Sequence, residues 1–223
     1  MFILKKNSII AIGVILLVLL VDQVVKIWVK VTFDIQETKP FIPNFLELYY
    51  IENRGMAFGT TLGDSHWAKY ALSIFRLLAI FGIGYYITKV IKEGAKTSFI
   101  IAISLIFAGA TGNLLDSMFY DLFFPIDPTI RTNMIVNDVG FPIHDHNGDV
   151  LLRERGFMLG SVVDMFHFTP VWPSWMPFDL AGQEIFSFVW NIADGAITIG
   201  VAMILFRYKS LTSINSDNLK EEE

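Results

Sequence analysis

The chain has 223 residues, of which 53% are hydrophobic and 17% are charged, and its formal net charge is −5 at pH 7. Soluble domains carry roughly 25% charged residues, so this composition argues against an ordinary cytosolic enzyme. The chain contains no cysteine, which excludes disulfides, a thiol nucleophile and thiolate metal ligands. No basic face of the kind that binds nucleic acid is visible in the sequence.

Four apolar segments have the roughly 20 residues needed to cross a bilayer: residues 8–29, 68–88, 97–115 and 184–207. The first could instead be a cleavable signal peptide. However, Asp22, Gln23 and Lys26 stand where small residues would form a cleavage site, which favours a retained helix. We therefore predict an α-helical multi-pass membrane protein with one embedded domain, residues 1–209, and a disordered cytoplasmic tail, residues 210–223.

Basic residues in short flanks mark the cytoplasmic side of membrane helices. They precede the first segment, fill the loop between the second and third, and follow the fourth: Lys5, Lys6, Lys89, Lys92, Lys96, Arg207 and Lys209. Both termini are thus predicted to be cytoplasmic. The segments 30–67 and 116–183 are predicted to lie on the outer side of the membrane.

The outer segments carry β signals. Residues 45–51 (FLELYYI) are rich in aromatic and β-branched residues, which favours a strand. Asn147–Gly148 is a two-residue turn signal that predicts a hairpin over 141–153. Alternating positions would put His144 and His146 on one face of a strand, where either a metal site or a solvated edge could lie.

Residues 170–177 (PVWPSWMP) contain too much proline for regular structure. Their two tryptophans, Trp172 and Trp175, are typical of the membrane–water boundary. We expect this segment to lie on the membrane surface.

Ionisable residues inside membrane segments are costly and usually functional. The distinctive polar residues gather toward the predicted outer leaflet: Asp22, Lys26, Asn53, Arg54, Asn113, Asp116, Asp164, Asn191 and Asp194. A spacing of three places Asn113 and Asp116 on one helix face, and likewise Asn191 and Asp194. Such pairs could serve interhelical hydrogen bonding or a reactive site. Asp22 and Lys26, four residues apart, could form an ion pair with each other.

The chemistry left open by these residues is that of aspartate, because cysteine is absent and all four histidines lie outside the predicted helices. Two close carboxylates share one proton, so that one can act as a base on water and the other as an acid on a carbonyl. A proton-coupled transporter using Asp22, Asp116 and Asp194, and a non-enzymatic scaffold, are the alternatives. The apolar inner half of the predicted helices argues against a transporter.

Five motifs follow one another along the chain: VDQVVK (21–26), NRGMAFG (53–59), GATGNLLD (109–116), GSVVDMFHF (160–168) and FSFVWNIAD (186–194). In this order they resemble lipoprotein signal peptidase, the type II signal peptidase of bacteria, from Val21 to about Gly200. The resemblance implies an inner-membrane aspartyl peptidase with four transmembrane helices and a small extracytoplasmic β-subdomain. It also implies prolipoprotein substrates, cut before a diacylglyceryl-modified cysteine, with membrane lipids as the other partners. No cofactor and no metal are expected.

Residue by residue, the resemblance implies that Asp164 and Asp194 form the catalytic dyad near the outer leaflet. It implies that eight further residues bind substrate or support the dyad: Asp22, Lys26, Asn53, Arg54, Gly55, Asn113, Asp116 and Asn191. The segment Asn53–Gly59 could close over the substrate as a lid, or could be a strand-to-turn corner.

The chain departs from the family pattern at three points. Ser117 replaces the arginine that usually follows the aspartate of GNxxD, which leaves the partner of Asp116 open. Trp190 replaces a common phenylalanine. Between Asp116 and Asp164 stand 47 residues where about ten are usual, and a further extension, 169–183, precedes the last apolar segment.

Overall fold

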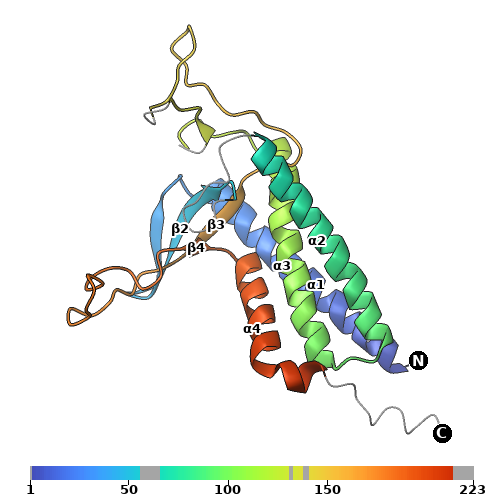
Figure 1. Cartoon of the computed structure of the whole chain (residues 1–223). Coiled ribbons are helices and arrows are strands. Elements are labelled where there is room, and N and C mark those ends of the chain that lie inside the picture. The colour runs from blue at the N-terminus through green and yellow to red at the C-terminus, as the bar shows by residue number, and fades with distance from the viewer. Residues whose placement is uncertain (1, 56–65, 131–132, 138–140, 213–223) are drawn as a thin grey trace, which may run out of the picture. The chain divides into compact units, whose positions relative to one another are not determined.

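The computed structural model describes residues 2–55, 66–130, 133–137 and 141–212. Its elements in chain order are α1 (Phe2–Thr32), β1 (Thr38–Ile42), β2 (Leu46–Asn53), α2 (His66–Lys92), α3 (Thr97–Phe123), β3 (Val162–Phe168), β4 (Val189–Trp190) and α4 (Ile192–Thr212) (Figure 1). Among the described residues, α1, α2 and α3 are long and apolar enough to cross a membrane, and α4 contributes the shorter apolar stretch Ile192–Phe206. The predicted fold class, a helical membrane protein with a small antiparallel sheet, is confirmed.

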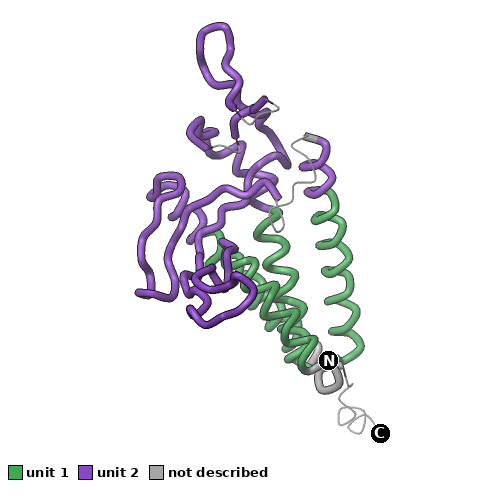
Figure 2. Tube along the Cα trace, turned by 60° about the vertical axis from the view of Figure 1, so that its left-hand side comes forward, with its two compact units in different colours: residues 1–24, 74–114, 192–223 green, residues 25–73, 115–191 purple. Residues whose placement is uncertain are grey.

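The chain folds as two compact units, coloured separately in Figure 2. The helical unit comprises residues 1–24, 74–114 and 192–223, and the sheet-bearing unit comprises residues 25–73 and 115–191. Three helices, α1, α2 and α3, therefore contribute one part of their length to each unit. Each unit has its own apolar core.

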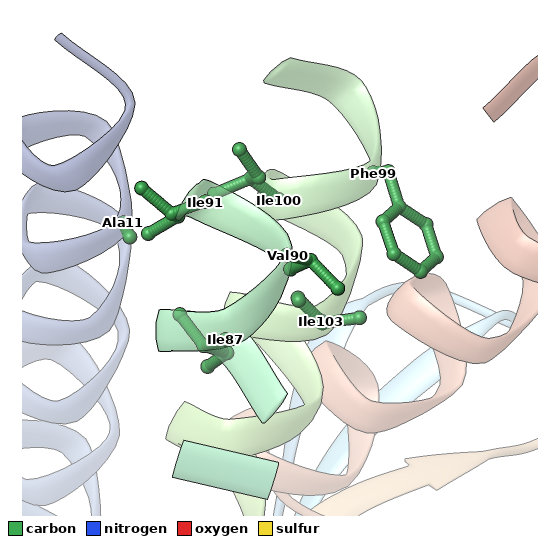
Figure 3. Close-up of a cluster of buried hydrophobic side chains, with 7 residues drawn as sticks. All are labelled: Ala11, Ile87, Val90, Ile91, Phe99, Ile100 and Ile103. Carbon is green, nitrogen blue, oxygen red and sulfur yellow. The ribbon is translucent and has the colours of Figure 1, made fainter. Parts of the chain in front are cut away.

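The core of the helical unit has its buried side chains on three helices (Figure 3). Apolar residues three and four positions apart give α2 and α3 one buried face each. The buried side chains are Ala11 of α1, Ile87, Val90 and Ile91 of α2, and Phe99, Ile100 and Ile103 of α3. Met203 and Ile204 of α4 pack against this cluster, so all four helices contribute to one core.

Glycines let the backbones of α3 and α4 approach closely. A Cβ at Gly109 would stand 2.2 Å from the carbonyl oxygen of Ala193, and one at Gly200 would stand 2.5 Å from that of Ala102. Small residues at such contacts are typical of helix packing in membranes, where close approach replaces a hydrophobic driving force. The glycines of the GATG segment thus place the first turn of α4 directly against α3.

The sheet has the order β1-β2-β3-β4, and each neighbouring pair is antiparallel. Strand β2 confirms the strand predicted over residues 45–51, and its side chains alternate between buried and half-buried positions. The buried face packs on a core of Val29, Phe33, Leu48, Tyr50, Tyr120, Val163 and Met165. Burial and the adjacent Glu52 carboxylate raise the pKa of Tyr50, whose hydroxyl donates to Glu52 Oε1 at 2.8 Å. Lys30 forms an ion pair with the same carboxylate.

Two predicted helix boundaries are wrong. The fourth helix begins at Ile192, not at residue 184, because Val189 and Trp190 pair with β3 as a strand before the helix starts. The third helix continues beyond residue 115 to Phe123. It ends shortly before Pro125, whose ring disfavours helical geometry in the preceding residue.

The hairpin predicted over 141–153 is present in the insert between α3 and β3. Three backbone hydrogen bonds link Ile135, Ile143 and Leu151 to one another. The amide of Ile135 donates to the carbonyl of Leu151 at 2.8 Å, that of Leu151 to Ile143 at 2.8 Å, and that of Ile143 to Ile135 at 2.9 Å. The predicted two-residue turn is wrong, since the amide of Asp145 donates to the carbonyl of Asp149 and so closes a three-residue loop. Three short segments of the insert, around Ile135, Ile143 and Leu151, therefore pair with one another.

The loop of this hairpin is organised by the side chain of Asp145. Its Oδ1 accepts from the amides of Asn147 at 2.8 Å and Asp149 at 3.0 Å, which lowers the pKa of the Asp145 carboxyl. His146 lies within this loop, whereas His144 pairs with Val150. The two histidines are thus not alternating positions of one strand, and the geometric premise of a shared face is wrong.

A buried ion pair attaches the insert to α3. Arg153 donates from both terminal nitrogens to the carboxylate of Asp121, at 2.6 and 2.8 Å, and from Nε to Asn133 Oδ1 at 2.8 Å. Arg155 donates to the carbonyl of Asp121 at 2.6 Å near the C-terminal end of α3. The base of the insert is therefore fixed at the last turns of α3.

Candidate functional site

Asp164 lies on β3 with only 2% of its surface exposed. Its Oδ1 accepts a hydrogen bond from Asn191 Nδ2 at 2.5 Å, and its Oδ2 accepts one from Asn53 Nδ2 at 3.2 Å. Asn53 is the last residue of β2, and Asn191 directly follows β4. The two strands that flank β3 thus each bring an amide to this carboxylate, which holds both of its oxygens in place.

The orientation of the Asn53 amide is set by the turn that follows β2. Gly55 donates its backbone N–H to Asn53 Oδ1 at 2.8 Å, so the Nδ2 of Asn53 is directed to Asp164. Gly55 has a φ of 103°, and a Cβ there would stand 2.2 Å from Leu72 Cδ2. A side chain at this position would therefore be strained by its φ and would have to displace the end of the Leu72 side chain. Residues 56–59 of the predicted lid lie outside the described residues.

Asp194 lies in the first turn of α4 and is half-buried. Its Oδ1 accepts a hydrogen bond from Asn113 Nδ2 of α3 at 2.8 Å. The close α3–α4 packing at Gly109 brings these two side chains together. Asp194 is therefore oriented by an amide, as Asp164 is.

Asp22 caps the start of α4. Its Oδ1 accepts from the backbone N–H of Ala193 at 2.9 Å, and its Oδ2 accepts from Gln23 Nε2 at 3.1 Å. A carboxylate is favourable at a helix N-terminus, where backbone N–H groups lack partners within the helix. A Cβ at Gly112 would stand 2.7 Å from Asp22 Oδ2, so this glycine leaves room for the cap. Asp22 thereby fixes the turn that carries Asp194.

Asp116 pairs with Lys26 of α1. Their charged atoms are 2.8 Å apart, and both side chains are fully buried. Ser117 stands where the family usually has an arginine, and the positively charged partner of Asp116 in this chain is Lys26. Ser117 is itself fully buried and accepts from Lys69 Nζ at 3.4 Å, while its carbonyl accepts from the amide of Gly160 at 2.9 Å.

The candidate residues from the sequence thus fall into two clusters. The Asp164 cluster, in the sheet-bearing unit, contains Asn53, Gly55, Asp164 and Asn191, and the Lys26–Asp116 pair belongs to the same unit. The Asp194 cluster, in the helical unit, contains Asp22, Asn113 and Asp194. The prediction that Asn191 and Asp194 share a helix face is wrong, because Asn191 precedes α4. Arg54 is half-buried beside Asn53.

Two polar features near these clusters were missed from the sequence. Lys69 and Ser73 are buried in the first turns of α2, and Ser73 donates to the carbonyl of Met158 at 3.0 Å. His167, which looks isolated in the sequence, lies between Glu47 at 2.8 Å and Glu184 at 3.2 Å. No local pattern reveals either feature, since the partners are distant along the chain.

The chemistry available in both clusters is that of carboxylates oriented by neutral amides. An amide donates to a carboxylate oxygen without competing for the proton, so it can fix geometry for acid–base work. Within the described ranges, no group of three or more histidine, aspartate or glutamate side chains is arranged to hold a metal ion.

Comparison with known proteins gives consistent matches along almost the whole chain. A family model described as Signal peptidase (SPase) II matches residues 14–209. The lipoprotein signal peptidase of Porphyromonas gingivalis is 36% identical over 214 residues, covering 93% of this chain and 86% of the relative. That of Fusobacterium nucleatum is 29% identical over 204 residues, covering 91% and 87%. A solved structure of a bacterial membrane enzyme, obtained by the in meso method at 1.9 Å, is similar in fold, with a TM-score of 0.55, 24% identity and coverage of 89% and 91%.

Proposed function

This chain belongs to the signal peptidase II family, and we propose that it removes the signal peptides of bacterial prolipoproteins as an aspartyl endopeptidase. The substrates that we propose carry diacylglycerol on the cysteine that follows the cleaved bond. A membrane enzyme suits such substrates, because both the signal peptide and the acyl chains reside in the bilayer. The proton-coupled transporter considered from the sequence has no support in these matches.

We propose Asp164 and Asp194 as the catalytic residues. The observation that carries this assignment is that each carboxylate is held by asparagine amides: Asp164 by Asn53 and Asn191, and Asp194 by Asn113. Fixed geometry is what acid–base catalysis requires, since a misplaced carboxylate loses the proton-transfer path. Asp22 and Gly55 act as positioning residues, through the first turn of α4 and through Asn53.

The reaction then follows from two carboxylates that share one proton. The ionised carboxylate removes a proton from a water molecule, and the resulting oxygen attacks the scissile carbonyl carbon. The protonated carboxyl donates to the carbonyl oxygen as the tetrahedral intermediate forms. The carbon–nitrogen bond then breaks, the departing amine takes up the proton removed from water, and one hydroxyl of the intermediate returns its proton to the carboxylate that had donated to the carbonyl oxygen. The amine is the new N-terminus of the lipid-bearing cysteine.

For the location of the enzyme, we propose the bacterial cytoplasmic membrane, with both termini in the cytoplasm and the chemistry near the outer leaflet. The basic flanks around Lys5, Lys92 and Arg207 support this orientation. The polar clusters support it as well, because Asp22, Asn113 and Asp194 lie toward the ends of the apolar segments that are farther from the basic flanks.

The assignment is tested by cleavage of one diacylglyceryl-modified prolipoprotein by purified enzyme in lipid nanodiscs. We expect Asp164→Asn and Asp194→Asn each to reduce kcat at least about 1,000-fold. The asparagine that replaces the aspartate in either variant cannot act as a proton donor or acceptor in catalysis. Asp145→Asn is the matched control, since Asp145 lies in the exposed hairpin loop. Full activity in either of the first two variants, with a normal melting temperature, would remove that aspartate from the proposed dyad.

A further inference from the structure

The extension between β3 and β4, residues 169–188, exposes several large apolar side chains. Trp175 is 76% exposed and Phe178 is 88% exposed, and Phe186 and Phe188 are exposed as well. The extension contains two acidic residues and no basic residue. Apolar patches of this kind on a protein surface usually mark a site that another molecule covers.

The extension is an ordered element that is tied to the sheet at its base. Thr169 donates to the carbonyl of Phe45 at 3.1 Å, and Ile185 donates to that of Pro170 at 2.9 Å. Between its two arms, the amides of Trp172 and Gly182 donate to the carbonyls of Gln183 and Trp172, at 2.8 and 3.0 Å. The exposed rings are therefore presented by a fixed backbone.

The exposed rings continue from the extension onto the first hairpin of the sheet. Phe168 contacts the ring of Phe45 with centroids 5.4 Å apart, and the ring of Phe186 with centroids 6.1 Å apart. Every residue of the edge strand β1 is exposed, including Phe41. We call these exposed side chains of the extension and the first hairpin the aromatic surface, formed by Phe41, Phe45, Trp175, Phe178, Phe186 and Phe188.

Strand β1, which carries Phe41 of the aromatic surface, contacts the ring that follows the end of a membrane-crossing helix. Trp28 and Val31 are exposed in the last turns of α1, a helix long and apolar enough to cross the bilayer. The ring of Trp28 meets that of Phe33 edge-on, with centroids 5.4 Å apart, and Lys39 Nζ of β1 lies 4.1 Å from the centroid of Phe33. All these residues belong to the sheet-bearing unit. Tryptophan at a helix end, followed by a lysine whose ammonium lies over a ring, is typical of the lipid headgroup region.

We propose that the aromatic surface is a lipid-binding surface that inserts into the headgroup region of the outer leaflet. The link from β1 through Phe33 to the exposed end of α1 identifies the bilayer as the molecule that covers it. The phenylalanine and tryptophan side chains of the extension, which has no basic residue, match the apolar boundary of this region rather than its phosphates. The surface thereby holds the sheet, which carries Asp164, at the membrane. This inference does not depend on peptidase activity.

The absence of cysteine allows a direct test with single-cysteine variants of the full chain. Spin labels are attached to Phe178→Cys and Phe41→Cys in nanodiscs of zwitterionic phospholipid. Two reference sites are used: Phe81→Cys, which is 67% exposed on the membrane-crossing helix α2, and Asn147→Cys, in the exposed loop of the insert. The measurement is the collision rate of each label with oxygen, which enters lipid, and with a water-soluble nickel chelate.

We expect the labels at Phe178 and Phe41 to give nickel collision rates between those at Phe81 and Asn147, and at least about fivefold below that at Asn147. Nickel access equal to that at Asn147, at either position, overturns the proposal. A surface built for another protein would give that aqueous result, because the nanodisc holds the purified chain alone. Matching melting temperatures across the four variants verify that each one is folded.

Discussion

Asn191 illustrates how one side chain can orient a carboxylate that we propose as catalytic. It directly precedes α4 in sequence, yet its amide holds Asp164 on β3 at 2.5 Å. Asn53 holds the other carboxylate oxygen, and is itself oriented by Gly55. Both amides are positioning groups under the proposed mechanism, because they contact the carboxylate and not the reacting bond.

We predict that Asn191→Ala lowers kcat about 10- to 100-fold with little change in KM, which corresponds to roughly 1.4–2.7 kcal/mol of transition-state stabilisation. The reason is that the Asp164 carboxylate keeps its place on β3 but loses one of its two amide contacts. Steady-state cleavage kinetics measure the effect, with Asn147→Ala as a control on the exposed hairpin. A rise in KM alone would indicate instead that Asn191 binds substrate.

At the scale of elements, two contacts explain how the helices support the clusters. The glycines of α3 bring α4 close enough for Asn113 to reach Asp194. The Asp121–Arg153 pair attaches the insert to the last turns of α3. The contact between α3 and α4 depends on glycines that have no side chain, and the contact between α3 and the insert depends on a buried ion pair.

We predict that Gly109→Ala destabilises the protein by about 1–3 kcal/mol, the usual cost of overpacking a tight contact. The new methyl group would stand 2.2 Å from the carbonyl oxygen of Ala193, and a backbone atom cannot move aside as a side-chain tip can. Gly82→Ala is the matched control on α2, where a Cβ meets nothing within 4 Å. Thermal unfolding in micelles measures both. Equal melting temperatures for the two variants would contradict close packing at Gly109.

For the insert, we predict that Asp121→Ala lowers the free energy of unfolding by about 3–5 kcal/mol, because it leaves the buried guanidinium of Arg153 without its carboxylate partner. The double variant Asp121→Ala/Arg153→Ala should cost less than the sum of the two single variants, since no buried charge is then left alone. A denaturation cycle on the four proteins measures this coupling. Additive costs would mean that the ion pair does not hold the insert.

At the scale of the whole molecule, the orientation of the chain stays a prediction from its basic flanks. We predict that a membrane-impermeant maleimide labels Asn147→Cys in intact cells, and labels Glu93→Cys only after the membrane is opened. Asn147 lies in the insert, and Glu93 is an exposed residue between α2 and α3. The cysteine-free parent chain serves as the blank. Labelling of Glu93→Cys in intact cells would reverse the proposed orientation.

The sequence allowed the family, the helical membrane fold and the β2 strand to be predicted correctly. Apolar length and strand composition are local properties, so they can be read from neighbouring residues. The start of α4 was predicted eight residues too early, because residues 184–191 are apolar enough to extend the segment. Val189 and Trp190 form a strand because they pair with β3. The pattern of apolar residues within 184–191 does not indicate that a distant strand pairs with this segment.

The sequence by itself determined which residues are candidates for chemistry, since its ordered motifs single out Asp164, Asp194 and the polar residues around them. Only the tertiary structure decided which of these residues meet. Lys26 pairs with Asp116, although Asp22 stood closer to it in the chain, and Asp22 instead caps α4 at Ala193. The physical reason is that a hydrogen bond or ion pair depends on distances of about 3 Å between atoms, and the packing of distant segments sets those distances.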